Sequence, residues 1–134
     1  MKYRFVEKLN EFLNAMGRSD LVNPQLDCHS NIQLEMSDVP AINIDLSSDD
    51  LIIWCSLMEC NYSRLDASHA SLLKSILEYV PRNFYPGQPA LNIMENNLVL
   101  SAVLKETSLD DMQLFADSFE EFFERVNELR LQLS

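Results

Sequence analysis

The chain has 134 residues, 47% of them apolar, and a formal net charge of −11. This length and composition are typical of one globular domain, taken as residues 1–134. The negative charge disfavours nucleic acid and anionic membrane surfaces as partners. Three cysteines without a C-x-x-C pair, no apolar run of about 20 residues and a charged N-terminus indicate a reducing cytoplasm, with no membrane helix or signal peptide.

The first predicted element is an amphipathic helix near residues 3–16, with apolar residues at helical spacing from Phe5 to Met16. Gly17 stands where the glycine that follows a helix would sit. The chain from residue 18 to residue 27 is expected to be irregular, because Asn23-Pro24 breaks regular structure.

Residues 27–57 predict a three-stranded antiparallel meander. The first two strands alternate apolar and polar residues, which is typical of half-buried strands; the apolar sets are Ile32, Leu34 and Met36, and Ile42, Ile44 and Leu46. The third strand is apolar on both sides, with Leu51, Ile53, Cys55 and Leu57 on one and Ile52 and Trp54 on the other. The period of two leaves open which alternating set faces the core and which faces a partner.

A second helix is predicted near residues 63–79 and ends at Pro81. Two strands, residues 90–94 and 98–104, follow and are joined by Glu95-Asn96-Asn97, where asparagine tolerates the positive φ of a tight hairpin. A last helix of about 24 residues is expected to open at Ser108 as its N-cap. The order is α-β-β-β-α-β-β-α, which predicts an α+β fold with a mainly antiparallel sheet.

The side chains that could carry chemistry do not form a recognisable site. Cys28 and His29 are adjacent, but neighbours in an extended segment point to opposite faces, and no zinc-ligand spacing occurs. The carboxylates mostly lie in turns or on polar helix faces, as solvated side chains do. We therefore expect no enzyme activity, no metal and no cofactor.

Apolar surface is in excess of what one small core requires. The third strand, the second helix and the fifth strand each carry apolar residues on more than one side. Either helices cover both faces of the sheet, or one surplus surface forms a homodimer and another binds a partner. The second alternative indicates a binding module.

Three runs resemble the class IB type III secretion chaperones of the InvB/SpaK group. They are D-C-H-S at 27–30, V-P-A-I-N-I at 39–44 and L-I-I-W at 51–54. The resemblance is most specific over residues 27–54, and it departs from the more usual D-S-H-S at Cys28. Beyond Tyr62 it rests on the pattern of elements, the acidity and the long last helix.

The resemblance implies a cytoplasmic bacterial homodimer that binds the non-globular N-terminal segment of one or several effectors, keeps it competent for secretion and delivers it to the export ATPase or sorting platform. The segment would wrap around the chaperone in extended form, with short helices and an added strand. No cofactor, nucleic acid or membrane is implied.

The same resemblance assigns residues to two surfaces. The first helix and first three strands imply an effector surface, with Ile32, Leu34, Ile42, Ile44, Ile52 and Trp54 as its residues. The second helix and later strands imply a dimer interface, with Leu72, Leu73, Ile76, Val99, Ser101 and Val103. Two alternatives remain: a structural or regulatory subunit of a cytoplasmic assembly without an unfolded client, and a small enzyme using Cys28 or a carboxylate pair.

Overall fold

A computed structural model describes residues 2–18, 32–36 and 39–134. The elements are α1 (Lys2–Ala15), β1 (Ile32–Met36), β2 (Val39–Asp45), β3 (Ile52–Glu59), α2 (Tyr62–Glu78), β4 (Ala90–Met94), β5 (Asn97–Val103), the short 3-10 helix η2 (Glu106–Leu109) and α3 (Met112–Leu133). Apart from η2, this order and the α+β class confirm the prediction.

All five strands join one antiparallel sheet in the order β1-β2-β3-β5-β4. The central strand is β3, which pairs with β2 on one side and β5 on the other. Ile53 and Cys55 on its inner side have no exposed surface, whereas Ile52 and Trp54 on its other side are half-buried. The neighbouring strands therefore half-cover Ile52 and Trp54, but these two side chains do not belong to the core.

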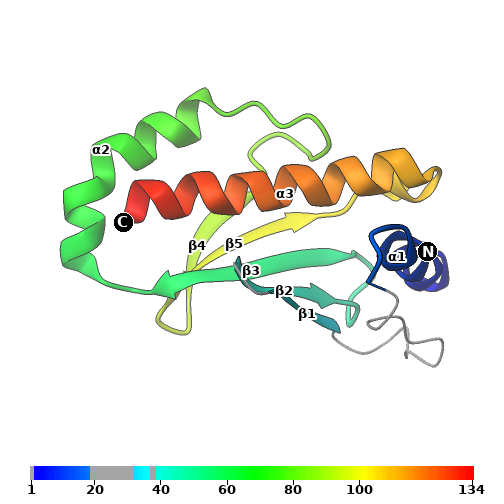
Figure 1. Ribbon diagram of the computed structural model, residues 1–134. Helices are drawn as coiled ribbons and strands as arrows, with labels where there is room; N and C mark the ends of the chain where they lie inside the picture. Colours follow the sequence, from blue (N-terminus) through cyan, green and yellow to red (C-terminus); the bar gives the residue numbers. More distant parts are fainter. Residues whose placement is uncertain (1, 19–31, 37–38) are drawn as a thin grey trace.

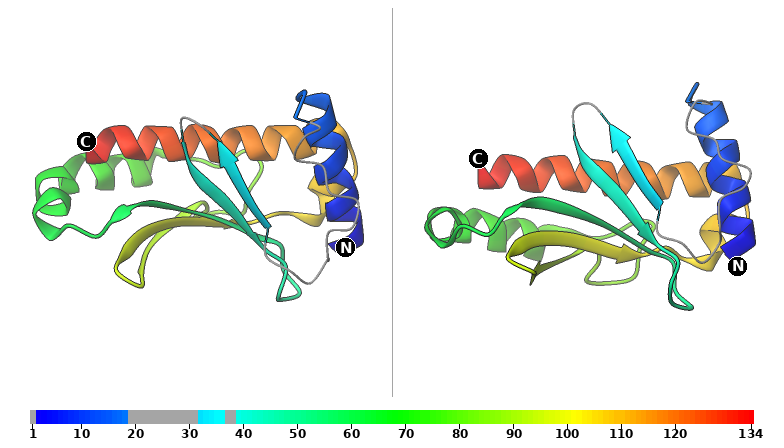
Figure 2. Two further views of the ribbon diagram at one scale, coloured as in Figure 1. Left: turned by 60° about the horizontal axis from the view of Figure 1, so that its bottom comes forward. Right: turned by 90° about the horizontal axis from the view of Figure 1, so that it is seen from below.

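The helices lie on one face of the sheet. α3 runs along this inner face, α1 crosses one end of it and α2 lies beside α3 (Figure 1). Seen from below, β1 and β2 cross in front of α3 (Figure 2). The opposite, outer face therefore carries none of the described helices, which disfavours the first of the two alternatives, helices on both faces.

Phenylalanines of α1 and α3 form the centre of the core. The ring centroids of Phe115 and Phe119 on α3 are 5.0 Å apart, and the Phe12 ring on α1 lies 5.6 Å and 5.7 Å from them. Phe115, Phe119 and Phe122 have no exposed surface. The apolar stripe predicted along the last helix therefore fixes α1 and the sheet on the same side of α3.

The end of α1 is as predicted. Gly17 has a φ of +75°, and its N–H donates to the Asn14 carbonyl at 3.1 Å. The Arg18 N–H donates to the Leu13 carbonyl at 2.8 Å. These two bonds are those of a Schellman motif, in which glycine takes the left-handed conformation without steric cost.

The β4–β5 turn also follows the prediction. Glu95 and Asn96 both have positive φ, at 49° and 64°. A two-residue hairpin turn requires this conformation at both central positions. As a result, β5 begins at Asn97, one residue earlier than expected.

The start of α3 was predicted wrongly. Ser108 lies in η2, before α3 begins, and its hydroxyl donates backward to the Lys105 carbonyl at 2.6 Å. Asp111 is the N-cap instead, with its carboxylate accepting from the Leu114 N–H at 2.9 Å. The helix has 22 residues because its first turn is replaced by η2.

Candidate partner-binding surfaces

Four of the six residues predicted to contact an effector lie in the core of the protomer. Their exposed fractions are 7% for Ile32, 4% for Leu34 and 0% for Ile42 and Ile44. They belong to the hydrophobic cluster that includes the α3 phenylalanines. The apolar side chains of β1 and β2 face the helices, where they are removed from water. We therefore assign these four side chains to the core rather than to an effector groove.

The other two predicted effector residues, Ile52 and Trp54, are half-buried on the outer face. Backbone pairing places Ile52 opposite Val103 and Trp54 opposite Ser101 on β5. Directly paired residues project from the same face of a sheet. Residues predicted for two different partners therefore form one patch, called here the outer patch: Ile52, Trp54, Ser101 and Val103.

The residues predicted for a dimer interface differ in exposure: Leu72 belongs to the core, Val99 is covered on the outer face of the sheet opposite Ser56, and others are exposed. Leu72 and Val99 are 8% and 5% exposed. The exposed ones belong to a set called here the α2 apolar face, with exposed fractions of 56% for Leu73, 47% for Ile76, 74% for Leu77 and 79% for Val80. Sequence reasoning did not assign Leu77 and Val80, the two most exposed of this set.

The inner side of α2 alternates small serines with larger side chains. Its buried residues are Ser68 and Leu72, and half-buried Leu65, Ser75 and Tyr79 continue the same side at helical spacing. Ser68 and Ser75 let α2 approach its neighbour closely, while Leu73 and Leu77 lie on its outward side. The spacing of Ser68 and Ser75 is the sequence signal that could have identified the outward face.

A buried arginine joins α2 to α3. Arg125 is 3% exposed, and its guanidinium donates to the Ser75 hydroxyl at 2.8 Å and to the Ser75 carbonyl at 3.2 Å. The guanidinium carbon lies 4.2 Å from the centroid of the Tyr79 ring, at cation–π distance. A bond to Glu128 at 3.1 Å provides an opposite charge. This arrangement fixes the C-terminal end of α2, and with it the α2 apolar face.

Glu121 holds the segment that follows α2. This carboxylate is 1% exposed and accepts from the Tyr79 hydroxyl, from the backbone N–H groups of Arg82 and Asn83 at 3.0 Å and 2.8 Å, and from the Asn83 amide at 2.9 Å. Burial alone would raise the pKa of Glu121, but these donors favour the ionised form, and the pKa is lowered overall. The sequence pattern placed Glu121 among the solvated carboxylates of the last helix and did not predict that it accepts these hydrogen bonds.

Replacing Glu121 by alanine is expected to lower the free energy of unfolding by about 2–4 kcal/mol, since it leaves the Tyr79 hydroxyl and two backbone N–H groups without their acceptor. The matched control is Glu120→Ala on the exposed side of α3, expected to change it by less than about 0.5 kcal/mol. Urea unfolding at pH 7 measures both. Equal losses for the two variants would contradict the role given to Glu121.

The stability difference between wild type and Glu121→Ala should also depend on pH, in a direction that the lowered pKa determines. The folded-state pKa of Glu121 lies below its ordinary value of 4.5, so its stabilisation is fully present above that value and is lost as the pH falls through the folded-state pKa. The stability gap between wild type and Glu121→Ala should therefore narrow between pH 5 and pH 3. A constant gap would contradict the lowered pKa.

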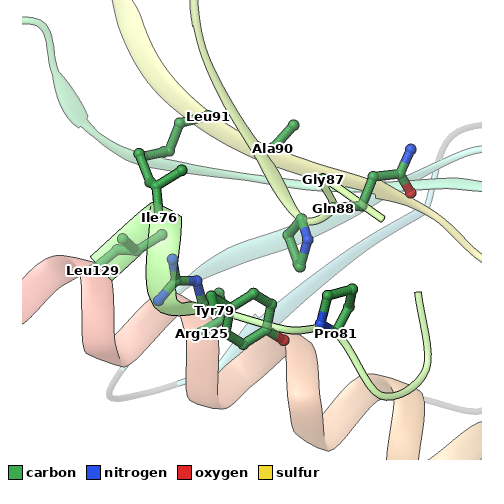
Figure 3. Close-up of a pocket in the computed structure, with 10 residues that line it drawn as sticks. Ile76, Tyr79, Pro81, Gly87, Gln88, Ala90, Leu91, Arg125 and Leu129 are labelled. Carbon is green, nitrogen blue, oxygen red and sulfur yellow. The ribbon is translucent and has the colours of Figure 1, made fainter. Parts of the chain in front are cut away.

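A pocket of about 250 Å³ opens where α2, α3 and the start of β4 meet (Figure 3). Ile76, Leu91 and Leu129 form its apolar side, and Arg125 beside Tyr79 forms its polar side. This volume suits one or two protein side chains rather than a larger ligand. The pocket extends the α2 apolar face toward β4.

The described residues assemble no metal centre: no group of three or more His, Cys, Asp or Glu side chains among them could hold an ion. Burial raises the pKa of the Cys55 thiol to about 11, against a smaller lowering by Arg130. The thiol is therefore protonated at neutral pH and is a poor nucleophile. Cys28 and His29 lie outside the described residues. None of the helices in the described ranges has the length and apolar character to span a membrane.

Comparison with known proteins gives a family and a fold. Residues 17–97, more than half of the chain, match the profile of the Invasion protein B family. The fold resembles a chain in the structure of the heterodimeric ExoU–SpcU complex from the type III secretion system of Pseudomonas aeruginosa, with a TM-score of 0.54 and 17% identity over 88% of this chain and 93% of that one.

Proposed function

The chain belongs to the Invasion protein B family, a family of type III secretion chaperones, and we propose that this effector chaperone is a cytoplasmic homodimer. The dimer binds the non-globular N-terminal segment of one or several effectors. Bound in this way, the segment stays soluble and is delivered to the export ATPase or sorting platform. The family and the fold are those of chaperones rather than of enzymes.

The observation that carries this proposal is apolar surface outside the core at two separate places on a strongly acidic protein: exposed on α2 and half-buried on the outer face of the sheet. The α2 apolar face exposes three leucine or isoleucine side chains and a valine, each by about half or more. The outer patch lies on a sheet face that none of the described helices covers. Contiguous apolar surface of this kind marks interaction sites, and the charge of −11 keeps a protein that carries it soluble.

We assign the α2 apolar face and the adjacent pocket to the dimer. A two-fold interface pairs the same surface of both copies, and a helix with an apolar outward side meets this need for self-complementarity. The outer patch and the edge strand β1 then remain for the effector. An edge strand offers unpaired backbone groups to an added strand, while the patch provides contacts for its apolar side chains.

The proposal is tested by affinity capture of the tagged chaperone from the bacterium that encodes it, with mass spectrometry of the co-purified proteins. The expected result is one or several effectors, bound through their N-terminal segments and made soluble by co-expression. Light scattering should then give two chaperones per effector. One chaperone per effector, as in a heterodimer, would contradict the homodimer. Failure to retain any unfolded segment would favour a structural subunit.

Replacing Trp54 by serine is expected to weaken binding of the captured effector segment at least tenfold, because a large aromatic contact at the centre of an interface is lost. Calorimetry measures the affinity, and light scattering should still give a dimer. Ile52→Val, a change of one methylene at the neighbouring position, serves as the mild control. If Trp54→Ser gives a folded monomer, the outer patch belongs to the dimer interface instead.

A further inference from the structure

A second hollow lies on the far side of α3 from α2, between α1 and α3. It measures about 350 Å³ and is lined from α1 by Phe12 and Met16 and from α3 by Ala116, Glu120, Phe123, Glu124 and Asn127. We call it the α1–α3 groove. The α3 positions follow one another at helical spacing from Ala116 to Asn127, a rise of about 16 Å along the helix. The groove is therefore long enough for about one or two turns of a bound segment.

The floor of the groove is apolar and anchored in the core. The Phe12 ring is 8% exposed and stacks on Phe119 at 5.7 Å, and Phe119 lies 6.4 Å from the half-buried Phe123. These contacts hold both floor rings in place before anything binds. Met16 is 48% exposed at the mouth of the groove, and its unbranched side chain adapts to different apolar partners.

The rim of the groove is acidic. Glu120 is exposed and forms no ion pair with any of the described residues, while Glu124 is paired only with the exposed Arg82, at 3.1 Å. Exposed ion pairs of this kind contribute little free energy, so Glu124 can also pair with a basic side chain of a bound segment. Within the described ranges, no Lys or Arg side chain lines the groove. An apolar floor beneath two carboxylates favours an apolar side chain that has a basic neighbour.

We propose that the α1–α3 groove binds a short helical stretch of the effector that places one large apolar side chain on Phe12 and Phe123 and a lysine or arginine, about one turn away, against Glu120 and Glu124. This rests on the proposed function and extends it by naming the chemistry that the groove selects. Helical segments dock in grooves through such anchors at i and i+3 or i+4. The acidic rim discriminates against segments with an acidic neighbour at that position, because like charges would face each other.

The test measures affinity for the N-terminal segment identified by affinity capture, synthesised as a peptide. Glu120→Lys should weaken its binding about tenfold at low salt, since an attraction becomes a repulsion, and the loss should shrink at high salt. Met16→Ser should weaken it several-fold at any salt. The control, Glu7→Lys, makes the same charge change on the exposed side of α1 outside the groove and should have little effect.

A charge exchange completes the test. A peptide with its basic residue changed to glutamate should bind wild type more weakly and regain affinity for Glu120→Lys. The groove proposal is overturned if Glu120→Lys and Glu7→Lys bind the peptide equally, or if Glu120→Lys alters the oligomeric state, which would place a second copy in the groove. If wild type binds no effector segment at all, the proposed function itself fails, which is a separate outcome.

Discussion

Replacing Phe119 by alanine is expected to lower the free energy of unfolding by about 3–5 kcal/mol. The side chain has no exposed surface, and its ring touches those of Phe12, Phe115 and Phe123 from two helices. Removing it leaves a cavity that three rigid rings cannot fill by rearranging. Denaturant unfolding followed by circular dichroism measures the loss, at one protein concentration for all variants because the stability of a dimer depends on concentration.

The control for this change is Leu131→Ala on the same helix, where the side chain is 75% exposed. It should change the free energy of unfolding by less than about 0.5 kcal/mol. A loss below about 1 kcal/mol for Phe119→Ala would mean that α1 and α3 are not held together through this ring, and the α1–α3 groove would lose its rigid floor as well.

Most helices and strands of this fold could be predicted from the sequence, because the spacing of apolar residues differs between the two. The alternation in β1 and β2, the apolar stripe of α3 and the glycine at position 17 predicted elements that the structure contains. The sequence did not predict which face of each element is buried in the core. Ile42 and Ile44 follow the same period whether they face a helix or a partner, and only the position of α1 and α3 above the sheet decides it.

Tertiary pairing explains the other differences. Ile52 and Ser101 were assigned to separate surfaces, but the pairing of β3 with β5 brings them onto one face, across almost 50 residues of sequence. Glu121 resembles its exposed neighbours in sequence and differs only because the chain after α2 returns to it with four donors. Ser108 and Asp111 both suit a helix cap, but Ser108 lies within η2, and the Asp111 carboxylate accepts from the first turn of α3.

The double change Leu73→Asp with Leu77→Asp is expected to convert the proposed dimer to a folded monomer. A two-fold interface contains each changed residue twice, so four leucine contacts are lost at once. At about 1.5 kcal/mol or more for each, the dimer is weakened by about 6 kcal/mol, or roughly 10⁴-fold in dissociation constant. Both side chains are more than half exposed in the protomer, so the fold itself should tolerate the change.

Sedimentation at micromolar concentration should show the mass of the wild type at twice the 15.5 kDa of the chain, and that of the double variant at 15.5 kDa. Leu131→Asp makes a similar change at a leucine that is 75% exposed on α3 and should leave the mass of the wild type unchanged. A dimer that survives the double change would exclude the α2 apolar face as its interface. The uncovered outer patch would then be the remaining candidate, and weaker effector binding in Trp54→Ser would have to be measured against its effect on the dimer.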